Sequence, residues 1–136
     1  MYIILLNKKY KKMKAIKITY WATTVIVAVM MIFSAYSYLT QDAMVQAFRH
    51  LGYPDYFRVE LAYGKLIGAI LLVAPVAARI KEWVYAGFVI TYVSAFIAHT
   101  ASGDPVNHGA MPLIFLALLV VSYVTYHKRN PALKTA

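Results

Sequence analysis

A few ionisable side chains lie inside stretches that are otherwise apolar, and these are the residues whose types could do chemistry. Glu60 and Lys65 fall within the apolar stretch 57–78. His99 falls within a second apolar stretch, 83–103. Ionisable side chains are costly in lipid, so those inside a membrane span are candidates for a functional site. Together a carboxylate, an ammonium and an imidazole could bind a polar group and exchange protons with it.

We expect these three groups to form a polar pocket in the outer half of a membrane, with Tyr63 and Tyr92 contributing hydroxyl groups. Glu60 and Lys65 are five residues apart, roughly 140° around a helix, so they are poor partners for each other. His99 is then the leading candidate to face Lys65 from another helix. The alternative is structural: the Lys65 ammonium reaches toward the interface and Glu60 lies in interfacial water. No residue is assigned a catalytic role.

Two glycines lie beside these groups. Gly64 and Gly68 form a G-x-x-x-G pattern on the same helical face as Glu60. Small residues let helices approach closely, so we expect both glycines to pack against a neighbouring helix. The alternative is that they leave room for a ligand beside Lys65.

The histidines offer little evidence of a metal or haem site in the sequence. His50, His99 and His108, with Asp104, have no tight ligand spacing, and the sequence predicts no metal. Haem b between spans needs two histidines at matching depth, whereas His127 belongs to the opposite side of the membrane from His99. The chain has no cysteine, which excludes disulfides, thiolate metal ligands and cysteine nucleophiles. No cofactor is therefore evident from ligand motifs.

The composition is typical of a polytopic membrane protein. The 136 residues are 62% hydrophobic and only 14% charged, whereas soluble domains are about 45–50% apolar and about 25% charged. The length indicates one domain. The net charge of +9 would suit nucleic acid, but six of the fourteen Lys and Arg residues lie between residues 8 and 17. Such clustering beside apolar runs indicates membrane topology, so we expect a lipid bilayer and no nucleic acid as the partner.

Four stretches match the roughly 20 apolar residues that cross a bilayer core. The predicted spans are about 18–39, 57–78, 83–103 and 109–126. The last of these tolerates Pro112 in its first turn. The predicted fold class is therefore all-α, a four-helix transmembrane bundle with a short outer interfacial amphipathic helix.

The amphipathic helix is predicted between the first two spans, where residues 40–56 are too polar to cross lipid. Apolar residues recur there at helical spacing, namely Met44, Val45, Phe48 and Leu51. This pattern favours a helix lying on the membrane surface. Gly52 can end the helix, because glycine is favoured just after a helix C-terminus.

Basic residues predict the domain organisation and the topology. We expect a basic cytoplasmic N-terminal segment at 1–17, a four-span membrane domain at 18–127 and a basic tail at 128–136. Residues 1–12 are expected to be a mobile extension or to precede a natural start at Met13. Four spans put eleven of the fourteen basic residues on the side of the two termini. The positive-inside rule then places both termini in the cytoplasm, with the chain in the inner membrane.

The order of several segments resembles the DoxX-like family of small bacterial four-span membrane proteins. These segments are FSAYSYLT, LGYPDYFR with GKLIGAILL, EWVYAGF and AHTASGDP, and the resemblance covers roughly residues 13–128. It implies a four-helix membrane protein without a catalytic motif to carry over. The broader DoxX group is distantly related to the DoxD subunit of an archaeal thiosulfate:quinone oxidoreductase. The resemblance thus implies a quinone-linked redox role as one interpretation.

Three functions are compatible with the sequence. The first is a membrane helper or interaction subunit, favoured by small-residue stripes and short loops, which acts as a homo-oligomer or with a partner membrane subunit. The second is the membrane subunit of a quinone-linked oxidoreductase. In it Lys65 and His99 donate hydrogen bonds to the quinone, Glu60 relays protons, and electrons come from a partner redox subunit or directly from a small reductant. The third is a carrier for a small anionic solute with Lys65 as counter-charge, which would have to oligomerise.

Overall fold

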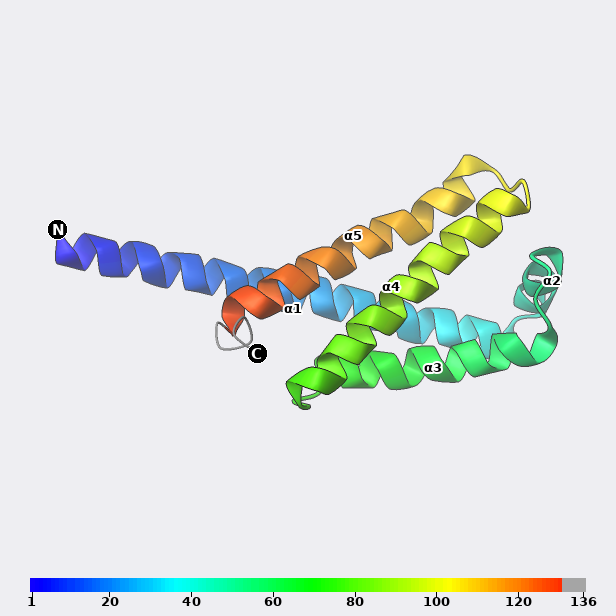
Figure 1. Ribbon diagram of the computed structural model, residues 1–136, viewed down its shortest axis with the longest axis horizontal. Coiled ribbons are helices and arrows are strands. Elements are labelled where there is room, and N and C mark those ends of the chain that lie inside the picture. The colour runs from blue at the N-terminus through cyan, green and yellow to red at the C-terminus, as the bar shows by residue number, and fades with distance from the viewer. Residues whose placement is uncertain (131–136) are drawn as a thin grey trace.

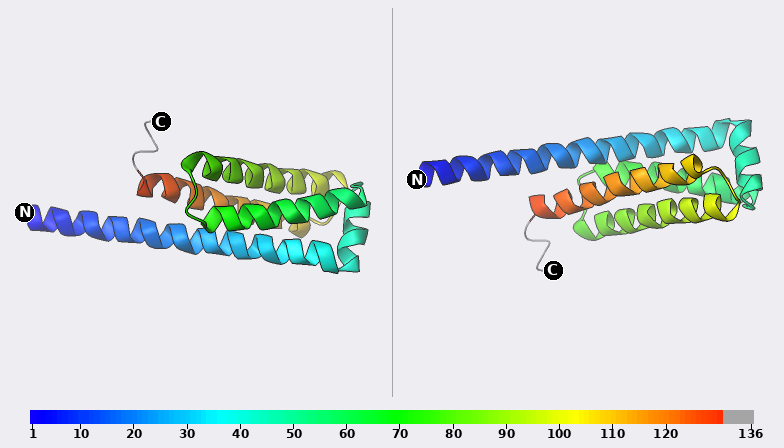
Figure 2. Two further views of the ribbon diagram at one scale, coloured as in Figure 1. Left: turned by 90° about the horizontal axis from the view of Figure 1, so that it is seen from below. Right: turned by 90° about the horizontal axis from the view of Figure 1, so that it is seen from above.

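The computed structural model describes residues 1–130, which form five helices (Figure 1). In chain order these are α1 (Tyr2–Thr40), α2 (Asp42–His50), α3 (Asp55–Val73), α4 (Ala78–Ala101) and α5 (Val106–Arg129). The four long helices run in alternating directions along one bundle, and α2 lies across one end of it (Figure 2). The all-α class is therefore confirmed. Residues 131–136 of the predicted tail lie outside the described residues.

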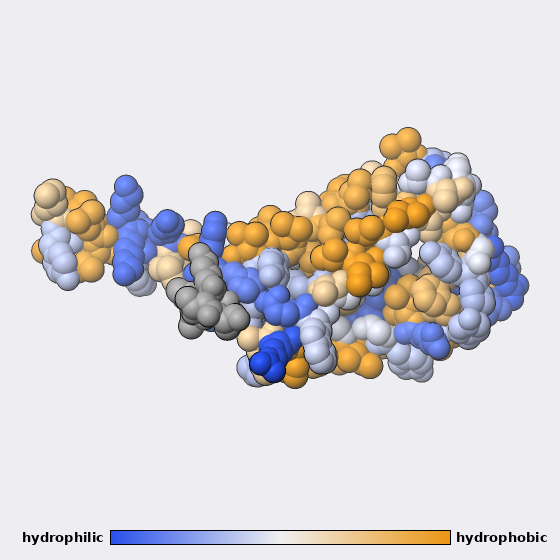
Figure 3. All heavy atoms as spheres, in the orientation of Figure 1, coloured by the Kyte–Doolittle hydropathy of each residue, from blue (hydrophilic) through white to orange (hydrophobic). Residues whose placement is uncertain are grey.

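Three of the helices are long and apolar enough to cross a membrane, namely α1, α4 and α5. Hydrophobic side chains cover much of the face of α4 and α5 in Figure 3, and exposed Ile90, Ile97 and Ile114 belong to these two helices. Helix α3 has 19 residues and includes four charged side chains, Asp55, Arg58, Glu60 and Lys65. Its composition alone therefore does not identify it as a span.

The N-terminal segment is helical. Helix α1 begins at Tyr2 and runs without interruption through the lysine cluster, so that its first turns extend beyond the other helices (Figure 1). Residues 2–12 are therefore a helical extension, and the mobility expected of residues 1–12 stays a prediction. The physical reason is that residues 2–40 contain neither Gly nor Pro, and lysine is a good helix former.

Helix α3 ends at Val73 rather than at residue 78. Ala74 precedes Pro75 and has an extended backbone with φ −67° and ψ 151°, as expected for a residue before proline. Lys81 lies between the predicted second and third spans, but in the structure it is part of α4 and is buried. Its ammonium donates to the carbonyl of Leu72 and so stabilises the C-terminal end of α3.

Helices α4 and α5 also begin earlier than predicted, at Ala78 instead of residue 83 and at Val106 instead of residue 109. The earlier start of α5 puts Pro112 in its second turn and not in its first. Since proline has no N–H, the carbonyl of His108 lacks its helical partner there.

Helix α2 separates polar from apolar side chains. Phe48 is buried, whereas Arg49 and His50 are exposed. Arg49 donates to Asp55 at the start of α3, with an N–O distance of 2.7 Å. Gly52 follows the helix with φ +81°, so its predicted role in ending the helix is confirmed. The position of α2 on a membrane surface stays a prediction.

In the bundle core, α1 packs against both α3 and α5. Helix α4 packs against α5 and, over a smaller contact, against α3. Apolar side chains such as Val27, Leu72 and Leu119 are fully buried there. The core also contains the hydroxyl of Ser122, which lies 2.6 Å from Thr24 Oγ1 and 2.8 Å from the Tyr85 hydroxyl. These hydrogen bonds connect α1, α4 and α5 and satisfy polar groups that water cannot reach.

The two glycines of the G-x-x-x-G pattern have different surroundings. A Cβ atom added to Gly68 would lie 2.7 Å from the ring of Phe88 on α4. At Gly64 an added Cβ would meet no atom within 4 Å. The structure therefore agrees with close packing at Gly68, and the expectation of close packing at Gly64 is wrong. Gly64 instead lines an open groove between α3 and α4, together with Gly87 and Thr91, so a side chain added there would have room.

Replacing Gly68 with leucine should destabilise the bundle, because the side chain would overlap the buried Phe88 ring. Overpacking of this kind costs about 1–3 kcal/mol. Thermal unfolding of the purified protein in detergent measures the effect. The matched control is Gly64→Leu, which should unfold close to the wild-type temperature. Equal losses in the two variants would contradict the assigned packing.

Candidate functional site

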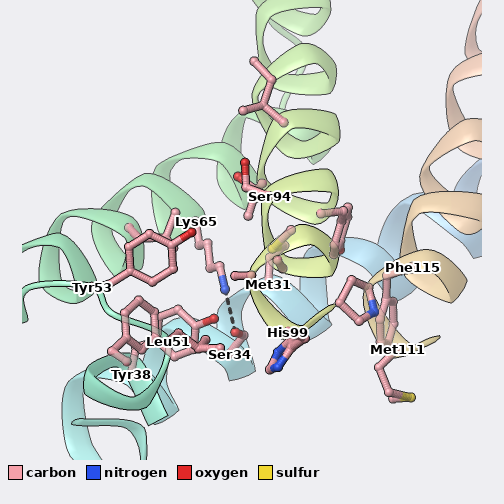
Figure 4. Close-up of a pocket in the computed structure, with 18 of the residues that line it drawn as sticks. Met31, Ser34, Tyr38, Leu51, Tyr53, Lys65, Ser94, His99, Met111 and Phe115 are labelled. Atoms are coloured by element: carbon pink, nitrogen blue, oxygen red, sulfur yellow. Dashed lines mark hydrogen bonds between the residues drawn. The ribbon is translucent and has the colours of Figure 1, made fainter. Parts of the chain in front are cut away.

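A cavity of about 400 Å³ lies between the helices, near the end of the bundle that α2 covers (Figure 4). All five helices contribute to its wall. Most of the wall is apolar and includes Met31, Leu51, Phe57, Ile90, Met111 and Phe115. The polar wall residues are fewer, so each of them has a strong influence on what the cavity can bind.

Lys65 of α3 contributes a positive charge to this wall. Its side chain is only 6% exposed, and its ammonium donates a hydrogen bond of 2.8 Å to the hydroxyl of Ser34 on α1 (Figure 4). The same ammonium lies 3.8 Å from the centroid of the Tyr38 ring, which is a cation–π contact. Among residues 1–130, no carboxylate oxygen lies within 4.0 Å of it. The buried cation is thus held by a hydroxyl and an aromatic ring.

The structure brings together some of the predicted pocket residues and separates others. Lys65, His99 and Tyr92 all line the cavity, and the Tyr92 ring stacks on Phe115. Glu60 and Tyr63 are exposed and do not belong to the wall. The cause is helical geometry, because residues five or two positions from Lys65 point to other faces of α3.

The partner of Lys65 also differs from the expected one. His99 donates to Asp104 and not to Lys65, whose partners are Ser34 and Tyr38. These two residues of α1 were not among the predicted pocket residues. Their spacing could have indicated a shared polar face, since residues four positions apart lie on the same face of a helix and Ser34 is a polar residue in an apolar stretch.

Asp104 links three segments at the α2 end of the bundle. One carboxylate oxygen lies 2.6 Å from Nδ1 of His99, which is on α4, and the other lies 2.8 Å from Nε2 of His50, which is on α2. Asp104 itself belongs to the turn between α4 and α5. The hydrogen bonds from His99 and, to a lesser degree, from His50 hold the pKa of Asp104 below its usual range. The carboxylate therefore stays ionised and ties α2 to the α4–α5 turn.

Replacing Asp104 with asparagine should loosen this connection, because an amide forms weaker hydrogen bonds than a carboxylate. We expect faster amide hydrogen exchange in α2 and in residues 102–105. Asp42→Asn is the matched control, because Asp42 is exposed and makes no ion pair within the described residues. Unchanged exchange rates in the Asp104 variant would show that the link does not hold α2.

Comparison with known families gives an independent result. The DoxX-like family matches residues 22–122, a range that includes α2, α3 and α4 completely, most of α5 and about the C-terminal half of α1. Neither curated proteins nor solved structures give a significant match. The family match confirms the resemblance seen in the sequence, and with the three long apolar helices it identifies a membrane protein. The chain therefore belongs to the DoxX-like family.

Proposed function

We propose that this protein is the membrane subunit of a quinone-linked oxidoreductase and binds the quinone ring in the cavity beside Lys65. The observation that carries the proposal is the buried ammonium of Lys65, which lies in an apolar wall and has no carboxylate partner within the described residues. Burying a cation without a counter-ion is costly. A bound ligand with a hydrogen-bond acceptor would offset that cost.

The chemistry of the wall favours a largely apolar ligand with carbonyl groups. An ammonium has three N–H donors, and the hydrogen bond to Ser34 uses one of them. With the Tyr38 ring also in contact with the ammonium, a further N–H would donate to a carbonyl oxygen of the ligand, while side chains such as Phe115 and Leu51 would contact its ring. A small anion would lose its hydration against the same apolar wall, which argues against the solute carrier. The volume also falls within the range of about 300–1,000 Å³ that is usual for small-molecule sites.

The proposed role of the chain is to bind and orient the quinone. Reduction of a quinone to the quinol consumes two electrons and two protons. The chain has no cysteine and so no thiolate ligands for an iron–sulfur cluster, and we assign the electron supply to a partner redox subunit. Glu60 is exposed and outside the cavity wall, so the proposal gives it no part in moving protons.

Replacing Lys65 with methionine should weaken binding of a short-tailed quinone analogue by at least about tenfold, which corresponds to roughly 1.4 kcal/mol. The measurement is a titration of the protein in lipid nanodiscs with the analogue. Glu60→Gln is the matched control on the same helix and should bind as the wild type does. Equal affinity in the two variants would contradict the proposal.

The same preparation separates the alternatives. A partner that co-purifies equally with wild type and Lys65→Met, without any bound quinone, would favour the helper or interaction subunit. Uptake of an anionic solute into liposomes, lost in Lys65→Met, would favour the carrier.

For the topology, we propose four spans, with α3 as the second span, α2 on the outer surface and both termini in the cytoplasm of the inner membrane. Two observations support this. Helix α3 packs against both α1 and α4, which are long and apolar enough to span. The N-terminal half of α1 and the C-terminal end of α5 also lie toward the same end of the bundle (Figure 2), and both carry basic clusters.

Reporter fusions test this topology. Alkaline phosphatase fused after Ala136 should be inactive, because the enzyme folds only outside the cytoplasm. The matched control is a fusion after Asp104, in the turn between α4 and α5, which should be active. An active fusion at the C-terminus would overturn the proposed orientation.

A further inference from the structure

We propose that His99, Asp104 and His108 form a binding site for a divalent transition metal ion of the zinc type. One ligand atom from each of these side chains lies within 4.8 Å of the ligand atoms of the other two. The sequence by itself predicts no metal here, because these residues have no tight ligand spacing. The fold nevertheless brings the three side chains close together. It places the last turn of α4, the turn after it and the first turn of α5 around one point.

The backbone of the turn holds the three residues in place. The amide of Asp104 donates to the carbonyl of His99 at 3.1 Å, and the amide of His108 donates to that of Pro105 at 2.9 Å. Gly103, which directly precedes Asp104, has φ +72°, a conformation that glycine adopts without strain. The ligands therefore sit on short, hydrogen-bonded segments, and little conformational entropy has to be lost when an ion binds.

His50 also contacts Asp104 and would hold its carboxylate in position from outside the proposed metal site. The oxygen that does not contact His99 lies 2.8 Å from Nε2 of His50. Such hydrogen bonds commonly orient metal-ligating carboxylates. The ring centroids of His99 and His108 are 5.9 Å apart, and His108 is exposed, so its ring can turn toward an ion without disturbing the core.

Binding requires only a small rearrangement. Ligand atoms about 2.0–2.2 Å from a tetrahedral ion are about 3.3–3.6 Å apart. His99 Nδ1 and the Asp104 oxygen are now 2.6 Å apart, in a hydrogen bond. An ion would replace this hydrogen bond, separate the two atoms slightly and draw His108 inward.

The ligand set decides the class of ion. Two imidazoles and one carboxylate suit Zn²⁺ and related transition metals, whereas Mg²⁺ and Ca²⁺ prefer oxygen ligands. Three protein ligands leave a coordination position open, as in zinc sites that bind water or a substrate. His99 and His108 both line the cavity, so the ion would lie at its edge. The inference does not depend on what the cavity binds.

The test is Zn²⁺ binding to the full chain, purified through a histidine-free tag, treated with EDTA and placed in nanodiscs. Calorimetric titration should show one Zn²⁺ bound per chain. His108→Ala should weaken binding at least about tenfold, and Asp104→Asn should weaken it as well. His127→Ala is the matched control, because this ring contacts Glu82 instead and should leave the affinity unchanged.

Two further measurements keep the result decisive. Unfolding temperatures without metal should agree for wild type and His108→Ala, which shows that a weaker affinity is not a folding defect. Co²⁺ bound to the wild type should give the visible absorption of a low-coordinate site, and this absorption should be lost in His108→Ala. Absence of stoichiometric binding to the wild type, or equal affinity in His108→Ala, would overturn the proposal.

Lys65→Met should keep its Zn²⁺ affinity, so that failure of quinone binding and failure of metal binding are distinguishable.

Discussion

The burial of the Lys65 ammonium constrains how the helices around the cavity can be arranged. A cation in an apolar interior loses its hydration, and other groups of the protein must replace the water. Ser34 and Tyr38 replace part of that water, and both belong to α1. These contacts favour the register of α1 and α3 that places Lys65 opposite the two side chains. The same register makes Lys65 part of the cavity wall, so one contact serves both the packing and the site.

A second constraint acts at the end of the bundle. Helix α2 has nine residues, and isolated helices of that length are marginal in water. Its packing through Phe48 and its hydrogen bond from His50 to Asp104 attach it to the rest of the molecule. Phe48 and Leu51 also line the cavity. The Asp104 carboxylate thus helps to close the end of the cavity, in addition to joining α2 to the α4–α5 turn.

Much of the secondary structure could be predicted because it depends on local composition. Long apolar runs form long helices, and Gly52 ends α2 as its position predicts. The errors have local causes too. Pro75 ends α3 early, and the residues between the predicted second and third spans extend α4, where buried Lys81 donates to the carbonyl of Leu72. The family resemblance, which depends on the order of several segments, agrees with the family match.

The candidate site could be predicted only in part. Lys65, His99 and Tyr92 were identifiable because polar groups in apolar stretches are conspicuous, and the structure places all three in the cavity wall. Which of the polar groups meet one another depends on the rotation of each helix about its axis, and that rotation is set by packing between helices. It turns Glu60 and Tyr63 outward and brings Ser34 to Lys65.

By itself, the sequence determined that this is an all-helical membrane protein of the DoxX-like family, because composition and segment order are properties of the chain alone. Only the tertiary structure decided that Lys65 pairs with Ser34 of α1 and that His50 of α2 reaches Asp104 in the α4–α5 turn. The physical reason is that such contacts join residues far apart in the chain, such as His50 and Asp104. Their proximity comes from the antiparallel packing of the helices and not from any local spacing.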